Sequence, residues 1–240
     1  MKQKPLFINQ QKTIDKAIDL PYFADFSDAG TGKTRSALEL FSRKRVAHPG
    51  KLLVITTKST MQAAWGATIK EFFPNLTYSI AVPPRRLPTI TQATTDVVIT
   101  NHDGVKDLIT PGFTLPAEYT YLIVDESTAF KNPNSKRTKA LLKIAPLFTT
   151  FRMVMTGTPT SNSLLDIFTQ IKVLDGGKHL GANYYAFRNV ITTIENNYTP
   201  FKKYIVKSGA EKAIGNTLRP ISIRNIFEEC ISIPNHNLSM

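Results

Sequence analysis

Short apolar runs alternate along this chain with segments whose apolar positions recur every three or four residues. Residues 52–56 are continuously apolar up to a final threonine and include β-branched side chains, which is typical of a central strand buried on both faces of a parallel sheet. The pattern predicts strands over residues 22–26, 52–56, 76–82, 96–100, 119–124 and 152–156.

Segments with helical spacing lie between most of these runs. In residues 5–20, Ile14, Ala17 and Ile18 fall on one helical face, Asn9 is a candidate cap, and Pro21 ends the helix. Residues 83–95 carry three prolines and many threonines, so we expect a loop there. Further helices are predicted over residues 33–46, 59–73, 101–109, 135–145 and 163–174.

The alternation of strands and helices predicts a doubly wound α/β domain with a mostly parallel sheet. After Asp175-Gly176-Gly177 the alternation ends, and the following residues are aromatic and rich in asparagine and lysine. We therefore expect residues 1–177 to form the α/β domain and residues 178–240 to form a partly helical C-terminal appendage.

Composition narrows the function classes. With 240 residues the chain can bury a sizeable core, and its single cysteine, Cys230, excludes an intrachain disulfide and a cysteine zinc site. No apolar run approaches the ~20 residues of a membrane-spanning helix, so we expect no membrane partner and a cytoplasmic location, in a bacterium or a phage-infected host. The net charge of +12 is spread along the chain and indicates a polyanionic partner, unless the protein is simply basic.

Residues 27–34, Ser-Asp-Ala-Gly-Thr-Gly-Lys-Thr, separate a predicted strand from a predicted helix. This arrangement is typical of a phosphate-binding loop, in which backbone amides and a helix N-terminus face a triphosphate. Gly30 and Gly32 let the backbone approach the phosphates, Lys33 would reach the β- and γ-phosphates, and Thr34 would ligate Mg²⁺. Ser27 stands where the usual pattern has glycine, and the alternative is a chance turn capped by threonine.

Two further predicted strands end in polar residues. Asp125 and Glu126 follow an apolar run, which suits an aspartate that holds Mg²⁺ and an acid that activates the attacking water. The alternative is a pair of acids that stabilises a helix dipole. Residues 156–159, Thr-Gly-Thr-Pro, follow the last strand and could sense the γ-phosphate, or form a plain turn.

Together these segments resemble the first RecA-like lobe of a superfamily-two helicase, and within that group the Swi/Snf-like double-stranded DNA translocases in their compact phage form. The resemblance covers residues 5–175, with a weaker tail to about 234. It implies that Gln10, with Gln11 as a neighbouring candidate, reads adenine. It further implies that Asp28, Ala29, Gly30, Thr31, Gly32, Lys33 and Thr34 hold the nucleotide.

The remaining matches concern the DNA side and the acidic segment. Residues 53–59 with Trp65 resemble motif Ia, and residues 98–103 resemble motif Ib. The resemblance implies DNA contacts by Thr57, Lys58, Asn101, His102 and Thr158. Ser127-Thr128 replaces the Ala-His usual after the acidic pair, and near Arg224 the two arginines and lysine common in the family are reduced to one arginine.

The resemblance implies ATP and Mg²⁺ as cofactors, duplex DNA as partner, and ATP hydrolysis coupled to movement along DNA. We expect a second RecA-like lobe, in cis or in trans, to supply an arginine finger, and weak hydrolysis by this chain alone. Two alternatives stay open. One is a non-catalytic nucleic-acid-binding module with a relic nucleotide pocket, and the other is a helicase that separates strands of RNA or branched DNA. Lys58 and Lys131 could also be solvated surface lysines.

Overall fold

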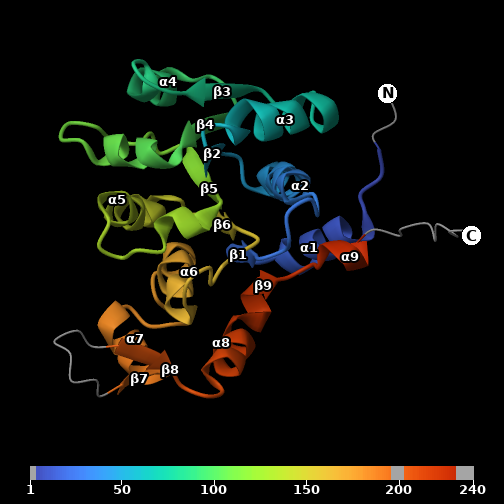
Figure 1. Ribbon diagram of the computed structural model, residues 1–240. Helices are drawn as coiled ribbons and strands as arrows, with labels where there is room; N and C mark the ends of the chain where they lie inside the picture. Colours follow the sequence, from blue (N-terminus) through green and yellow to red (C-terminus); the bar gives the residue numbers. More distant parts are fainter. Residues whose placement is uncertain (1–3, 196–202, 231–240) are drawn as a thin grey trace, which may run out of the picture.

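The computed structural model describes residues 4–195 and 203–230. Its centre is a seven-stranded sheet in the order β3-β4-β2-β5-β6-β1-β9, and every neighbouring pair is parallel (Figure 1). This confirms the predicted α/β fold with a mostly parallel sheet. The strands are β1 (Tyr22–Asp25), β2 (Lys51–Thr56), β3 (Tyr78–Ala81), β4 (Val97–Asn101), β5 (Tyr119–Asp125), β6 (Phe151–Met155) and β9 (Ser222–Ile223).

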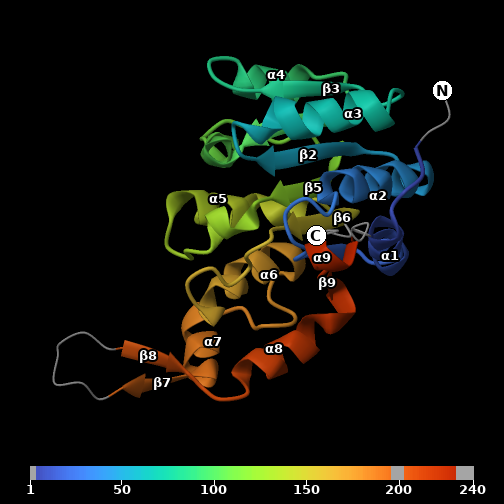
Figure 2. The same cartoon turned by 45° about the vertical axis from the view of Figure 1, so that its right-hand side comes forward.

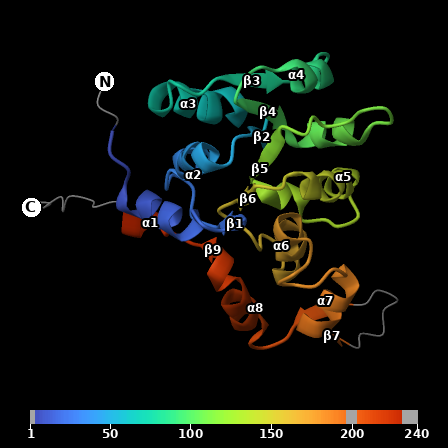
Figure 3. The same cartoon turned by 180° about the vertical axis from the view of Figure 1, so that it is seen from behind.

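Helices cover both faces of the sheet, as the apolar run in β2 requires. Figure 3 shows the sheet between two sets of helices. Leu52 and Val54 join a core beneath one set, whereas Leu53 and Ile55 join a second core beneath the other set. The first set is α1 (Ile8–Ala17), α2 (Lys33–Ala47), the π-helical η1 (Met61–Gly66) and α3 (Ala67–Phe72). The second set is α4 (Arg86–Gln92), the 3-10 helix η2 (His102–Ile109), α5 (Lys136–Ile144) and α6 (Ile167–Asp175).

Two local expectations are wrong. Residues 83–95 are not all loop, because they include α4. Pro88 lies in the first turn of α4, where a missing N–H costs no helical hydrogen bond, so the prolines misled the sequence analysis. Asn9 does not cap α1, which begins at Ile8 after the N-cap Phe7. Asn9 instead lies inside the helix and turns its side chain to another part of the chain.

The segment after α6, expected to be a partly helical appendage, contains both helices and strands. Helix α7 (Tyr184–Ile191) leads into an antiparallel hairpin of β7 (Thr192–Glu195) and β8 (Lys203–Val206), which projects from the body (Figure 2). Helix α8 (Ala210–Leu218) then runs back to β9, which pairs with β1, and α9 (Phe227–Cys230) follows. Short 3-10 helices complete the described chain: η3 (Ser127–Phe130), η4 (Ala145–Leu147), η5 (Leu164–Asp166) and η6 (Arg219–Ile221).

The hydrophobic core continues into this last segment. Phe187 of α7 and Ile214 and Leu218 of α8 belong to the same buried cluster as Phe168 of α6. The division at residue 177 stays a prediction. Among residues 4–195 and 203–230, no helix is both long and apolar enough to cross a membrane.

Candidate nucleotide-binding site

The predicted site residues gather at one edge of the sheet. Because all its strands are parallel, their carboxyl ends meet there in the order β4, β2, β5, β6, β1. Open α/β sheets bind ligands at this edge. The phosphate loop follows β1, the acidic pair ends β5, and the threonine-rich turn follows β6 between them. Gln10 comes from α1, which precedes β1 in the chain, whereas Lys33 and Thr34 begin α2, directly after the phosphate loop.

The phosphate loop folds around its own lysine. The Lys33 ammonium donates hydrogen bonds to the carbonyl oxygens of Ser27, at 2.6 Å, and Asp28, at 2.8 Å. Gly30 and Gly32 both have φ of 81°, a left-handed conformation that side chains rarely adopt. The lysine thus closes a ring of backbone at the start of the 15-residue helix α2, whose N-terminal amides favour an anion.

Helix α1 supports the loop from one side. Asn9 donates from Nδ2 to the carbonyl of Thr31 at 2.8 Å, and Gln10 donates from Nε2 to the carbonyl of Gly32 at 3.2 Å. The Gln10 Oε1 accepts from the Phe7 amide at 3.0 Å, and the Gln10 side chain is buried. Both side-chain amides therefore stabilise the loop, and the Phe7 side chain, just before α1, is exposed.

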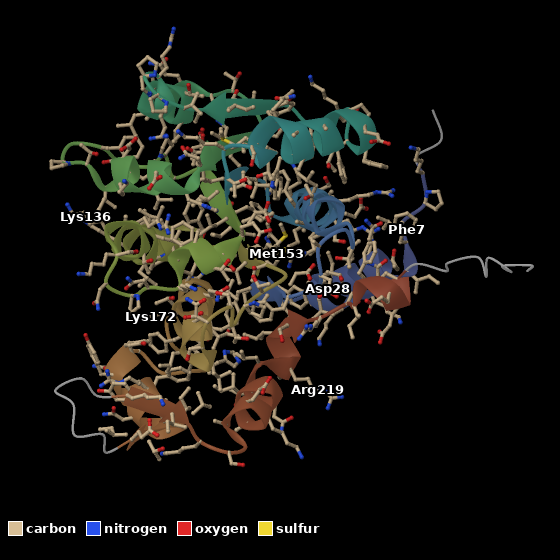
Figure 4. The ribbon with its side chains drawn as sticks, viewed as in Figure 1. Phe7, Asp28, Lys136, Met153, Lys172 and Arg219 are labelled. Carbon is tan, nitrogen blue, oxygen red and sulfur yellow. The ribbon has the colours of Figure 1, made fainter. Side chains whose placement is uncertain are left out.

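A segment from the other end of the described chain supports the loop as well. We call residues 223–227 the C-terminal strap. Asn225 donates from its backbone N and from Nδ2 to Ser27 Oγ, each at 2.9 Å, and its carbonyl accepts from the Asp28 amide at 3.0 Å. The Phe227 amide donates to Asp28 Oδ2 at 3.1 Å, and the Phe227 ring packs on Gly30 (Figure 4 shows Asp28 beside α9). Ser27, the departure from the usual glycine, is thus the acceptor for the strap.

The acidic pair at the end of β5 is held by side chains. Asp125 is buried, and its Oδ2 accepts from Thr56 Oγ1 and from Trp65 Nε1, both at 2.9 Å. Its Oδ1 accepts from the Glu126 amide at 3.0 Å. Glu126 has φ of 49°, which is unusual for a residue other than glycine, and such backbone strain concentrates at functional sites.

Glu126 lies within electrostatic reach of the phosphate loop. Partial burial, and secondarily the charge of Asp125, raise the pKa of Glu126, while Lys33 and a hydrogen bond from Thr156 Oγ1 at 3.4 Å oppose that shift. A carboxyl group whose pKa is raised toward the working pH is a stronger general base. The structure therefore brings Lys33, Glu126 and Thr156 to the same part of the sheet edge.

The turn after β6 packs directly on the phosphate loop. Thr156 is buried, and its hydroxyl accepts from the Thr158 amide at 3.2 Å while contacting Glu126. At Gly157 an added Cβ would lie only 3.5 Å from the Ala29 amide nitrogen. The turn thus touches both the acid and the loop, which suits a group that senses the γ-phosphate.

The predicted DNA-side residues differ in exposure. Lys58 and Thr158 are exposed and Thr57 is half-buried, so all three can be reached from solvent. Asn101 is only 4% exposed, and its Oδ1 accepts from Arg86 Nη2 of α4 at 2.5 Å.

His102, another predicted DNA contact, binds the end of β5 at Asp125. Its Nε2 lies 2.8 Å from the carbonyl oxygen of Asp125, and a carbonyl can only accept, so Nε2 carries the proton. Burial lowers the pKa of His102, which favours the neutral ring.

Several supporting residues escaped the sequence analysis. Asn225 and Phe227 lie about 200 residues from the loop they contact, and no local pattern marks that pairing. Thr56 and Trp65 fell within the segment that resembles motif Ia, but nothing in the sequence indicated that both bind Asp125. The buried Arg86, which binds Asn101, lies in α4, where the sequence predicted a loop.

Comparison with known proteins decides the family. A family model described as the SNF2-related domain matches residues 23–239. The chain belongs to the SNF2-related family. One relative of this SNF2-related chain is the "ATP-dependent helicase FUN30" of Saccharomyces cerevisiae, which is 26% identical over 61% of this chain and 13% of the helicase. Another is "Putative protein p41" of Acyrthosiphon pisum secondary endosymbiont phage 1, which is 27% identical over 74% of this chain and 41% of p41.

A solved structure agrees with the SNF2-related assignment. The Sulfolobus solfataricus SWI2/SNF2 ATPase core in complex with dsDNA superposes with a TM-score of 0.72 at 20% identity, over 95% of this chain and 46% of that one. This likeness confirms the predicted RecA-like fold. The chain spans less than half the length of each of these three proteins.

Proposed function

We propose that this chain is the ATP-binding lobe of an ATP-driven translocase that moves on duplex DNA when a second RecA-like lobe completes the site. The observation that carries the proposal is the meeting of Lys33, Glu126 and Thr156 at the edge of the sheet beside the phosphate loop. The family membership supports ATP as the nucleotide.

Hydrolysis would proceed by in-line attack of water on the γ-phosphorus. Glu126 is the base that takes the proton of this water, and its raised pKa suits the role. Lys33 and the loop amides of residues 28–34 neutralise charge on the phosphate oxygens as the bond to the β-phosphate breaks. Adenine would lie near Phe7 and Gln10, on the side of the loop that α1 supports.

The residues around the loop fit a magnesium ion carried by the nucleotide. Thr34 and Asp125 offer hydroxyl and carboxylate oxygens, the donors that Mg²⁺ prefers. Within the described part of the chain, the Thr34 hydroxyl has no hydrogen-bond partner, so it is available to a ligand. The same residues contain no cluster of three or more His, Cys, Asp or Glu that could hold a metal ion. Phosphate oxygens and water would therefore complete the coordination of Mg²⁺. When bound, Mg²⁺ would neutralise charge on the β- and γ-phosphates.

DNA would lie along the β2 and β4 end of the same edge. Lys58 and Thr57 are accessible there, and Thr158 is accessible after β6, two strands along the sheet from β2. Such contacts to phosphates are independent of sequence and weaken with salt. The DNA complex of the Sulfolobus ATPase core supports duplex DNA as the partner.

The experiment is an ATPase assay with and without duplex DNA, together with calorimetric titration of ADP. We expect nucleotide binding, slow hydrolysis by this chain alone, and loss of hydrolysis but not of binding in Glu126→Gln. Binding without any hydrolysis, unchanged by Glu126→Gln, would favour a nucleic-acid-binding module with a relic pocket. DNA-stimulated turnover equal to that of a two-lobed enzyme would contradict the need for a second lobe, and strand displacement on RNA or branched DNA would favour the strand-separating alternative.

A further inference from the structure

The carboxylate of Asp125 is held by two donors from outside its own strand. Thr56 ends β2, and Trp65 belongs to the π-helical segment η1, yet both donate to the same oxygen, Oδ2, at 2.9 Å. We call Thr56 and Trp65 the carboxylate clamp. Both clamp side chains are 0% exposed. A fully buried donor pair of this kind fixes the plane and the direction of the carboxylate.

The clamp distinguishes the two oxygens of Asp125. Oδ2 accepts two hydrogen bonds from the clamp, whereas Oδ1 accepts one, from the Glu126 amide at 3.0 Å. A carboxylate oxygen can accept about two hydrogen bonds, so Oδ1 keeps a free lone pair and Oδ2 does not. Oδ1 is therefore the oxygen that Asp125 offers to a ligand.

The Asp125 carboxylate fixes the direction of the Thr56 hydroxyl proton, and further hydroxyl groups lie beside Thr56. A carboxylate only accepts, so Thr56 gives its hydroxyl proton to Asp125. The Thr60 hydroxyl lies 2.6 Å from the Thr56 hydroxyl and also donates to the Thr57 carbonyl at 3.1 Å. The Thr57 hydroxyl lies 2.8 Å from that of Thr60. The Thr56 proton is thus directed at Asp125 Oδ2.

The local backbone explains how Trp65 reaches Asp125. Residues Met61–Gly66 form a π-helix, which has a wider turn than an α-helix and occurs often at functional sites. Trp65 sits in the buried core beside Val54 and Ile123 with its indole nitrogen as its one polar atom. A buried indole N–H needs a partner, and Asp125 is that partner.

We propose that Trp65 and Thr56 are positioning residues that orient Asp125 so that Oδ1 faces the magnesium ion of a bound nucleotide. This inference rests on the proposed function, because it requires a nucleotide in the phosphate loop. Neither side chain is expected to touch nucleotide or metal. Partners that orient a metal ligand in this way change metal affinity about 10–100-fold when they are removed.

The test is calorimetric titration of ADP in EDTA and again in MgCl₂. Trp65→Phe removes the indole donor and keeps an aromatic ring, and Thr56→Val removes the other donor at nearly constant size. For each variant we expect unchanged ADP affinity in EDTA and a loss of about tenfold in the gain that MgCl₂ brings. Thr56→Ser, which keeps the hydroxyl, should restore that gain.

Tyr121→Phe is the matched control for the loss of a buried aromatic hydrogen bond. Tyr121 shares the core with Trp65, but its hydroxyl donates at 2.6 Å to the carbonyl of His48, after α2 and away from the acidic pair. Tyr121→Phe should leave ADP affinity unchanged both in EDTA and in MgCl₂. The proposal is overturned if the clamp variants keep the full gain with MgCl₂, or if they lose affinity equally in EDTA. An unaltered chain that binds no ADP at all would instead overturn the proposed function.

Discussion

The phosphate loop and the acidic pair lie two strands apart on one edge of the sheet, yet they are held differently. The loop takes its shape from its own residues, through two left-handed glycines and Lys33 bound to Ser27 and Asp28. Its outer supports come from α1 and from the C-terminal strap. Asp125 instead receives side-chain donors from the end of the neighbouring strand and from η1.

The difference has a thermodynamic consequence. The loop is bound mainly through backbone atoms and stands at the surface, so a ligand can replace some of its internal bonds. Asp125 is bound through buried side chains, and a buried polar group left without its partner costs about 1–3 kcal/mol. The loop is thus the adaptable half of the site and Asp125 the rigid half.

The largest effect is expected from Lys33→Ala. The ammonium group now bound to Ser27 and Asp28 would be the main charge on the nucleotide phosphates. Hydrogen bonds to charged groups contribute about 1.5–3 kcal/mol each, so ADP affinity should fall about 100-fold or more. Calorimetry measures this loss, and Lys139→Ala, an exposed lysine on α5, is the control. Equal ADP affinities for the two variants would show that Lys33 does not bind the nucleotide.

Gly32→Ala should damage the loop next. Alanine at this position would have to adopt the left-handed backbone conformation of Gly32, and its Cβ would collide with Gln10 Nε2. Gly112 has a similar φ of 82° with no atom within 4 Å of an added Cβ, so Gly112→Ala reports the backbone strain alone. We expect a loss of about 1–2 kcal/mol for Gly112→Ala and a larger loss for Gly32→Ala in urea unfolding. Equal losses would mean that α1 does not brace the loop.

This contrast also explains what the sequence could and could not predict. The strands, the phosphate loop and the acidic pair follow from local patterns, because apolar runs, glycines and paired acids act within a few residues of one another. The supports are tertiary. Asn9 is a residue type that often caps helices, but its side chain binds the carbonyl of Thr31. Asn225 reaches Ser27 because β9, just before it, pairs with β1, just before Ser27.

The region after residue 177 was the hardest to predict. Its two-residue strand β9 is too short to leave a pattern, and its pairing with β1 joins residues about 200 positions apart. Helix α4 was hidden for another reason, since Pro88 breaks helices in their interior but is tolerated in a first turn. Composition alone cannot separate these two cases.

Asn225→Ala tests the strap as a support of the loop. It removes the Nδ2 bonds to Ser27 Oγ, at 2.9 Å, and to Thr13 Oγ1, at 3.2 Å. Net losses of about 0.5–1.5 kcal/mol for each of the two bonds predict a destabilisation of about 1–3 kcal/mol in urea unfolding. Asn216→Ala, at an exposed position of α8, should show no loss. If the two variants unfold alike, the strap lies on the loop without stabilising it.

The smallest effect is expected from Asp25→Asn and is seen as a change in pH dependence. Asp25 lies beneath the loop, 1% exposed, and its Oδ1 accepts from the Ser27 amide at 3.0 Å. Burial raises its pKa above the ordinary 3.8, although hydrogen bonds from Ser27 and the charge of Lys33 oppose the shift. Between the unfolded and folded pKa values the folded state binds more protons, so the Asp25 contribution to stability falls as pH rises through that interval.

Asparagine keeps the acceptor for the Ser27 amide and never ionises. The free energy of unfolding of Asp25→Asn, measured in urea from pH 4 to pH 8, should therefore lack this decline and should exceed that of the unaltered chain most at the alkaline end. Asp15→Asn, at an exposed position of α1, should leave the pH dependence unchanged. A variant that loses stability most at the alkaline end would show that the Asp25 charge itself stabilises the loop through Lys33. The loop would then depend, as Asp125 does, on a buried side-chain contact rather than on backbone bonds alone.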